Sequence, residues 1–174
     1  MRLNRSIVKT LKHTTVLIGL SAAAMLPPGS AHATEPGAYV GVGLGSAHDD
    51  ILNEDESAFK FYGGINLSHN IGLELGYVDL GNYANGALTQ DGISYELIGY
   101  LPLSSNLDLY GKAGFFSWEV ANASTSNTGT DATFGVGLQA QLHSQISLRG
   151  EYQVFMDVDG GDVDLYSASI NLHF

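Results

Sequence analysis

Apolar and polar side chains alternate along most of this chain, from Ala38 to the last residue. A period of two is typical of β-strands, whose successive side chains point to opposite faces, and a helical repeat of 3.6 residues has little support here. Eight such segments stand between polar or glycine-rich breaks. The predicted strands span 38–46, 58–67, 71–80, 92–101, 107–118, 131–142, 146–157 and 164–174. We therefore expect an all-β fold.

The connections between these segments alternate in length. Counted from the predicted spans, they hold 11, 3, 11, 5, 12, 3 and 6 residues. In an up-and-down barrel, every second connection lies at the same end, and outer-membrane barrels combine short periplasmic turns with longer surface loops. The lengths predict an eight-stranded antiparallel transmembrane β-barrel with both termini in the periplasm.

The two faces of the predicted strands differ in chemistry. In the segment 146–157, one face carries Ile146, Leu148, Tyr152, Val154 and Met156, and the other carries Ser147, Arg149, Glu151 and Gln153. Lipid accepts only apolar side chains, whereas the lumen of a small barrel accepts polar ones. We expect the apolar face to contact lipid. A soluble barrel of the lipocalin type, the alternative, would reverse the two faces.

The first 33 residues are of another kind. Four basic residues come first (Arg2, Arg5, Lys9 and Lys12), an apolar run over 14–26 follows, and the segment ends in Ala31-His32-Ala33. This order is typical of a secretory signal peptide, and the apolar run is short for a membrane anchor, the alternative. We expect residues 1–33 to be cleaved after Ala33, which leaves 34–174 as the barrel domain.

The predicted mature chain is strongly acidic. Four of the seven Lys and Arg residues lie in the signal segment, which contains none of the 18 Asp and Glu residues. Residues 34–174 therefore have 7 − 4 = 3 cations against 18 carboxylates, a formal charge of −15. Such a charge argues against nucleic acid as a partner. Because the chain has no cysteine, thiol chemistry is excluded as well.

The remaining cations share the polar face with four carboxylates. These inward residues are Lys60, Glu74, Glu96, Asp108, Lys112, Arg149 and Glu151. An eight-stranded barrel has an interior just wide enough for side chains, and buried ions need partners. We expect the seven residues to form an ion network that fills the lumen. A narrow gated pore is the alternative.

Aromatic residues mark one height on the predicted outer face, toward the long connections. They are Phe59, Tyr77, Tyr95, Phe115, Phe134 and Tyr166. Amphipathic rings favour the headgroup level of a membrane, so these residues predict an interfacial girdle.

The last strand and three internal segments resemble a known family. The chain ends with Tyr166, Ile170, Leu172 and Phe174 on one face, which resembles the signal that the barrel-assembly machinery recognises in outer-membrane proteins. Residues 70–81, 107–114 and 147–153 resemble strands three, five and seven of the OmpA transmembrane domain, in order and at similar spacing. The likeness to this family of small outer-membrane barrels, which includes OmpX-type and opacity-type proteins, covers essentially all of residues 34–174.

The resemblance implies a location in the outer membrane and an interior ion pair. Glu74 and Arg149 match a glutamate and an arginine that pair inside the family's barrels. The family's second interior pair is not matched, since the candidate positions hold Ile98 or nearby Leu97 and Gln139. Many relatives also carry a C-terminal peptidoglycan-binding domain, and we expect none in this sequence.

No residue pattern in the sequence predicts catalysis, a cofactor or a metal site. The histidines of residues 34–174 lie on different predicted strands or turns. The acidic segment 157–164 lacks the residue order and the final glutamate of a calcium-binding EF-hand loop. An enzyme that modifies lipid A would need a serine, a histidine and a carboxylate near the lipid headgroups, and the sequence indicates no such set.

These features together predict a non-enzymatic outer-membrane protein that supports envelope structure and integrity. The alternatives are a surface adhesin or receptor that acts through 47–57, 81–91 and 119–130, and a narrow pore of low conductance. The expected partners are outer-membrane lipid and lipopolysaccharide, the barrel-assembly machinery during insertion, and a surface ligand if the loops bind one.

Overall fold

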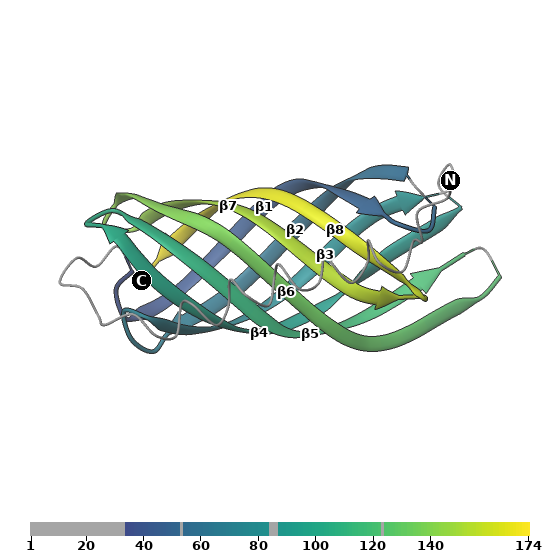
Figure 1. Cartoon of the computed structure of the whole chain (residues 1–174), viewed down its shortest axis with the longest axis horizontal. Helices are drawn as coiled ribbons and strands as arrows, with labels where there is room; N and C mark the ends of the chain where they lie inside the picture. The colour runs from purple at the N-terminus through teal and green to yellow at the C-terminus, as the bar shows by residue number, and fades with distance from the viewer. Residues whose placement is uncertain (1–33, 53, 84–86, 123) are drawn as a thin grey trace, which may run out of the picture.

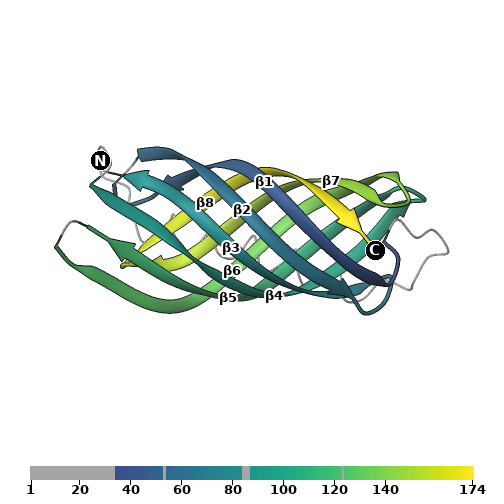
Figure 2. The ribbon, with the colours of Figure 1, turned by 180° about the vertical axis from the view of Figure 1, so that it is seen from behind.

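The computed structural model describes residues 34–52, 54–83, 87–122 and 124–174, so the predicted signal segment lies outside the described residues. The chain forms a closed barrel of eight antiparallel strands, each paired with its neighbours in sequence (Figures 1 and 2). The strands are β1 (Gly37–Asp49), β2 (Glu54–Asn66), β3 (Ile71–Tyr83), β4 (Leu88–Ser104), β5 (Leu107–Ala121), β6 (Ser126–His143), β7 (Ile146–Val158) and β8 (Gly161–His173). The predicted fold class is confirmed.

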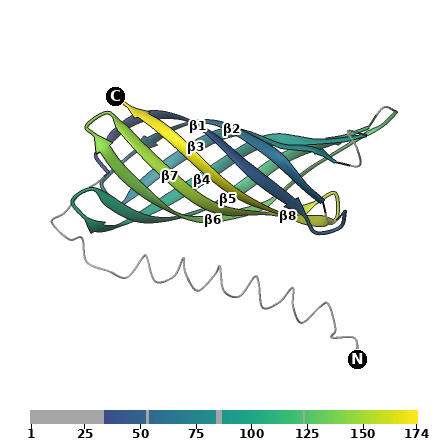
Figure 3. The ribbon, with the colours of Figure 1, turned by 90° about the horizontal axis from the view of Figure 1, so that it is seen from above.

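The first and last strands close the barrel. Tyr39 on β1 pairs with His173 on β8, and the pairing continues to Asp49 and Val163 (Figure 3). Both ends of this described barrel domain therefore lie at one end of the barrel, which we call the terminal end. The opposite end, where β1 meets β2 and β3 meets β4, is the hairpin end. Among the described residues, no helix is long and apolar enough to cross a bilayer.

The strands extend farther toward the hairpin end than the sequence predicted. The segments 47–57, 81–91 and 119–130, expected to be long loops, consist mainly of paired strand, because the pairing continues to Asp49–Glu54, Tyr83–Leu88 and Ala121–Ser126. The hairpin of β5 and β6 projects beyond the others (Figure 1). These segments are polar but contain no proline, so their backbone groups can still complete the ladder of hydrogen bonds.

The outer face carries apolar side chains, as the alternation predicted. Exposed examples from four strands are Leu44, Leu73, Leu138 and Ile170. Five of the six predicted girdle residues are exposed on this face: Phe59, Tyr77, Tyr95, Phe115 and Tyr166. Phe134 is only partly exposed.

The lumen has two chemically different halves. The half toward the hairpin end holds a buried cluster that we call the apolar layer: Ala47, Ala58, Val78, Leu80, Tyr83, Phe116, Trp118, Val120, Phe155, Val158, Val163 and Leu165. The half toward the terminal end is polar and charged. The sequence predicted only the polar half, because several of these apolar residues lie beyond the predicted strand ends, where no face was assigned to them.

Candidate functional site

Lys112 lies at the centre of the charged half of the lumen. Its Nζ contacts three carboxylates, at 3.0 Å (Glu96 Oε2), 3.1 Å (Glu151 Oε1) and 3.6 Å (Glu74 Oε1). Glu74 and Glu96 are directly paired on β3 and β4. Like charges in such a position repel each other, and the ammonium group of Lys112 between them compensates this repulsion.

Two further cations complete the cluster. Arg149 Nη1 lies 2.6 Å from Glu74 Oε2, and Lys60 Nζ contacts Glu151 Oε1. We call the six residues the ion network: Lys60, Glu74, Glu96, Lys112, Arg149 and Glu151. A buried charge that loses its partner lowers the stability of a fold by several kcal/mol. The three cations and three carboxylates can therefore all remain ionised in the lumen only because each has a partner of opposite charge.

Neutral side chains supply further hydrogen bonds to the ion network. They are Tyr39, Tyr100, Tyr110, Gln139 and Gln153. Tyr39 donates to Glu74 Oε2 and Tyr110 donates to Glu151 Oε2, both at 2.8 Å. Buried polar networks stabilise a fold when every member has partners. Within the described lumen, each carboxylate of the ion network accepts at least one hydrogen bond from a neutral group besides its ion pair.

Aromatic rings surround the guanidinium group of Arg149. Its Cζ lies 4.9 Å from the ring centre of Tyr39, 5.1 Å from that of Tyr110 and 5.5 Å from that of Tyr62. These distances are in the range of cation–π contacts. A Cβ atom at Gly64 would come within 2.4 Å of the Tyr39 hydroxyl, so glycine at this position leaves the room that the ring occupies.

Asp108, the seventh residue predicted for the network, lies apart from the other six. Its Oδ2 accepts a hydrogen bond of 2.5 Å from Thr34 Oγ1, which in turn accepts one from Gln139 Nε2 at 2.9 Å. Gln139 Oε1 accepts a hydrogen bond from Arg149 Nε at 2.7 Å. Asp108 is therefore connected to the ion network through Thr34 and Gln139. The first described residue, Thr34, closes the terminal end of the lumen as a buried side chain.

Sequence reasoning missed the neutral members of this site. Gln139 was noted only as a departure from the family's glutamate, yet it joins Arg149 to Thr34. The tyrosines share the inward parity with the ions, and this parity was the signal that could have identified them. Alternation shows which face a side chain occupies, but it does not show which residues of different strands meet at one height.

The apolar layer closes the other half of the lumen. The ring centres of Phe116 and Phe155 lie 4.5 Å apart, and both side chains are buried. The described lumen thus contains two different packings in series.

The four residues predicted as an assembly signal lie on the outer face of the last strand. Tyr166, Ile170, Leu172 and Phe174 are all exposed.

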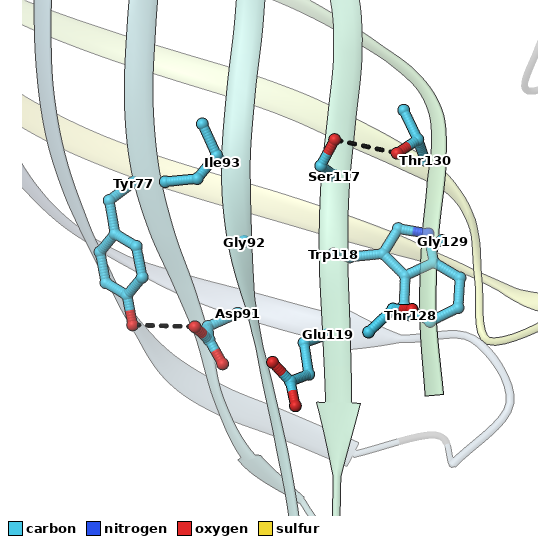
Figure 4. Close-up of a pocket in the computed structure, with 10 residues that line it drawn as sticks. All are labelled: Tyr77, Asp91, Gly92, Ile93, Ser117, Trp118, Glu119, Thr128, Gly129 and Thr130. Atoms are coloured by element: carbon cyan, nitrogen blue, oxygen red, sulfur yellow. Dashed lines mark hydrogen bonds between the residues drawn. The ribbon is translucent and has the colours of Figure 1, made fainter. Parts of the chain in front are cut away.

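A groove of about 500 Å³ lies on the flank of the barrel near the hairpin end (Figure 4). Its lining includes Asp91 and Glu119, which are direct neighbours on β4 and β5. The Tyr77 hydroxyl donates to Asp91 Oδ2 at 3.1 Å, and the hydroxyls of Ser117 and Thr130 are 2.9 Å apart. Two carboxylates and several hydroxyl groups therefore line the groove beside apolar side chains such as Ile93 and Trp118.

Comparison with known proteins identifies relatives of the barrel. The family model for the outer membrane protein β-barrel domain matches residues 14–174. Outer membrane protein A of Salmonella typhi is 24% identical over 168 residues, which cover 82% of this chain and 48% of that protein. The chain thus spans about half the length of the curated relatives that it matches.

Solved structures share the fold. The N-terminal β-barrel domain of Pseudomonas aeruginosa OprF matches with a TM-score of 0.60 and 14% identity, over 78% of this chain and 97% of that domain. The attachment invasion locus protein Ail of Yersinia pestis, solved with the heparin analogue sucrose octasulfate, matches with a TM-score of 0.53 and 15% identity, over 81% of this chain and 100% of Ail.

Proposed function

The chain belongs to the outer membrane protein β-barrel domain family and lies in the outer membrane, and from this premise we propose that it is a non-enzymatic structural protein that supports envelope integrity. The observation that carries the proposal is the filling of the lumen. The ion network and the apolar layer occupy it in series. A barrel built in this way adds a rigid, closed element to the membrane.

The proposal includes an orientation and a route of assembly. Residues 1–33 direct export and are removed after Ala33. The terminal end faces the periplasm, and the acidic hairpins face outward among lipopolysaccharide. The barrel-assembly machinery reads the outer face of β8, where Tyr166, Ile170, Leu172 and Phe174 are exposed.

The test is complementation of a deletion strain. The structure allows each long hairpin to be shortened at a paired position without loss of the apolar layer. An Asn-Gly turn can join Ala47 to Glu56, Tyr83 to Leu88, and Val120 to Asn127, so that the register of the barrel below is kept. We expect the deletion to raise sensitivity to detergent and vancomycin, and both the full barrel and the trimmed barrel to restore resistance. A change of gel mobility on boiling shows that each version is folded.

Two outcomes would contradict the structural role. One is a deletion with no increase in sensitivity. The other is a trimmed barrel that folds in the outer membrane but fails to restore resistance, which would assign the function to the hairpins.

A surface adhesin or receptor is the second candidate, and the projecting β5–β6 hairpin with its acidic groove favours it. The described residues of the hairpin segments 47–57, 81–91, 119–130 and 157–164 include no Lys or Arg. A sulfated glycan such as the ligand solved with Ail would therefore meet like charge, and a cationic ligand fits better. Binding of a cationic peptide that is lost in the trimmed barrel would support this candidate.

A further inference from the structure

Polar side chains gather inside the barrel at its hairpin end, beside the apolar layer. Asp49 at the end of β1 is buried, and its Oδ2 accepts a hydrogen bond of 2.9 Å from Gln90 Nε2 on β4. Glu56 on β2 lies against Gly81 of β3, where an added Cβ would come within 2.6 Å of Glu56 Cβ. Gly81 is in turn paired with Gln90. Groups from four strands therefore meet at this mouth of the lumen.

Two buried oxygen atoms at the mouth have no hydrogen-bond partner in the described structure: Gln90 Oε1 and the Tyr83 hydroxyl. Gln90 is 3% exposed and Tyr83 is 0% exposed. Because Gln90 Oε1 belongs to the amide group that binds Asp49, it lies beside that carboxylate. A buried polar atom without a partner destabilises a fold, so each of these two oxygens is available to accept a ligand.

The surroundings of the Tyr83 hydroxyl are acidic. Burial raises the pKa of this hydroxyl, and so do nearby carboxylates, in decreasing order those of Asp49, Glu56, Asp55 and Glu54. The hydroxyl therefore lies within the electrostatic field of the carboxylates at the mouth.

No lysine or arginine of the described residues lies at this mouth. Residues 34–174 contain three Lys and Arg residues, and all three belong to the ion network in the other half of the lumen. His48 is paired with Asp55, its Nδ1 being 2.9 Å from Asp55 Oδ1. The mouth therefore combines carboxylates with neutral oxygen atoms, and within the described residues it has no Lys or Arg.

We propose that this mouth binds one divalent cation of the calcium class, through the carboxylates of Asp49 and Glu56, Gln90 Oε1 and the Tyr83 hydroxyl. These four residues form the outer-mouth site. Calcium prefers six to eight oxygen ligands from carboxylates, amide carbonyls and water. A bound ion would give both buried oxygens a partner and would link β1 and β2 to β3 and β4. No motif predicts the site, because its residues come from four strands.

The experiment is a calcium titration of the metal-free, full-length folded barrel in detergent, followed by calorimetry. We expect saturable binding of one Ca²⁺ per barrel. Glu56→Gln is expected to weaken the affinity at least tenfold, and Tyr83→Phe, which keeps the ring in the apolar layer, at least threefold. Glu119→Gln is the matched control, because it removes one carboxylate charge from the outer groove instead of the mouth. The calcium affinity of this variant is expected to equal that of the unchanged barrel.

A second measurement uses terbium, which replaces calcium and emits when a nearby aromatic ring absorbs. Trp118, the single tryptophan of the chain, packs in the same apolar layer as Tyr83. In the unchanged barrel and in the Glu119→Gln control, added calcium should displace the bound terbium, so that the terbium emission decreases. Should Glu56→Gln fail to show heat-modifiable folding, Gln90→Met replaces it, since it removes the amide oxygen at similar volume.

Three results would overturn the proposal. The first is no saturable binding below about 10 mM Ca²⁺, which is weaker than extracellular calcium modules. The second is that Glu119→Gln and Glu56→Gln lower the calcium affinity equally, which would show that calcium is attracted diffusely to the surface charge. The third is unchanged affinity in folded Tyr83→Phe, which would mean that water satisfies the hydroxyl. The proposal does not depend on the envelope role, and either can fail alone.

Discussion

At the scale of single residues, Lys112 holds three carboxylates together. It contacts every glutamate of the ion network, whereas Arg149 and Lys60 each pair closely with one. Alternation in the sequence predicted that all seven ionic residues face inward, and they do lie in the lumen. It could not predict the central place of Lys112 or the separation of Asp108, because both depend on the stagger of strands that are distant in sequence.

Replacing Lys112 with Met should destabilise the barrel by about 3–5 kcal/mol, since it leaves three buried carboxylates with two cations. Urea unfolding in lipid vesicles, followed by Trp118 fluorescence, measures the change. Glu119→Gln on the exposed flank should change stability by less than about 0.5 kcal/mol. Adding Glu96→Gln to Lys112→Met should recover part of the loss, and a double variant no more stable than Lys112→Met would contradict the charge-matching argument.

At the scale of elements, the polar hairpins are strands rather than loops. The sequence of 119–130 is rich in Ser, Thr and Asn, which is typical of a connector, and for that reason a loop was predicted. Composition could not show that β5 and β6 continue side by side, because strand pairing depends on the partner's register as well as on local preference. The parts of the strands near the terminal end alternate clearly, and their bounds agree with the prediction to within a few residues.

Hydrogen exchange distinguishes the two descriptions of the β5–β6 hairpin. Because Ser117 to Ala121 pair with Ser126 to Thr130, the amides that bond across this ladder should exchange more slowly than those at its tip, including Ser124 and Thr125. Solution NMR in micelles or mass spectrometry in nanodiscs can resolve the difference. Uniformly fast exchange over 117–130 would favour a mobile loop.

At the scale of the whole molecule, the lumen contains two packed layers in series, the ion network and the apolar layer. The sequence predicted the ionic one from the parity of its charges. It did not predict the apolar layer, because single apolar residues beyond the predicted strand ends do not indicate that they converge on one axis.

The unchanged barrel should therefore show no stable conductance in planar bilayers. Disrupting one layer alone, by Phe116→Ala with Phe155→Ala or by Glu74→Gln with Arg149→Met, should produce no measurable conductance. The other layer still fills its half of the lumen. Only the combination of all four changes is expected to conduct, provided that it still shows heat-modifiable folding. Steady current steps from the unchanged barrel would support the narrow pore instead.

The pairing of β1 with β8 also sets an order in time. Tyr39 pairs with His173, so the first strand cannot complete its hydrogen bonds until the ribosome has made β8. Until then, both edges of the growing sheet are open to wrong partners. The barrel therefore cannot close before β8 has been made, and until then the chain depends on whatever protects those edges.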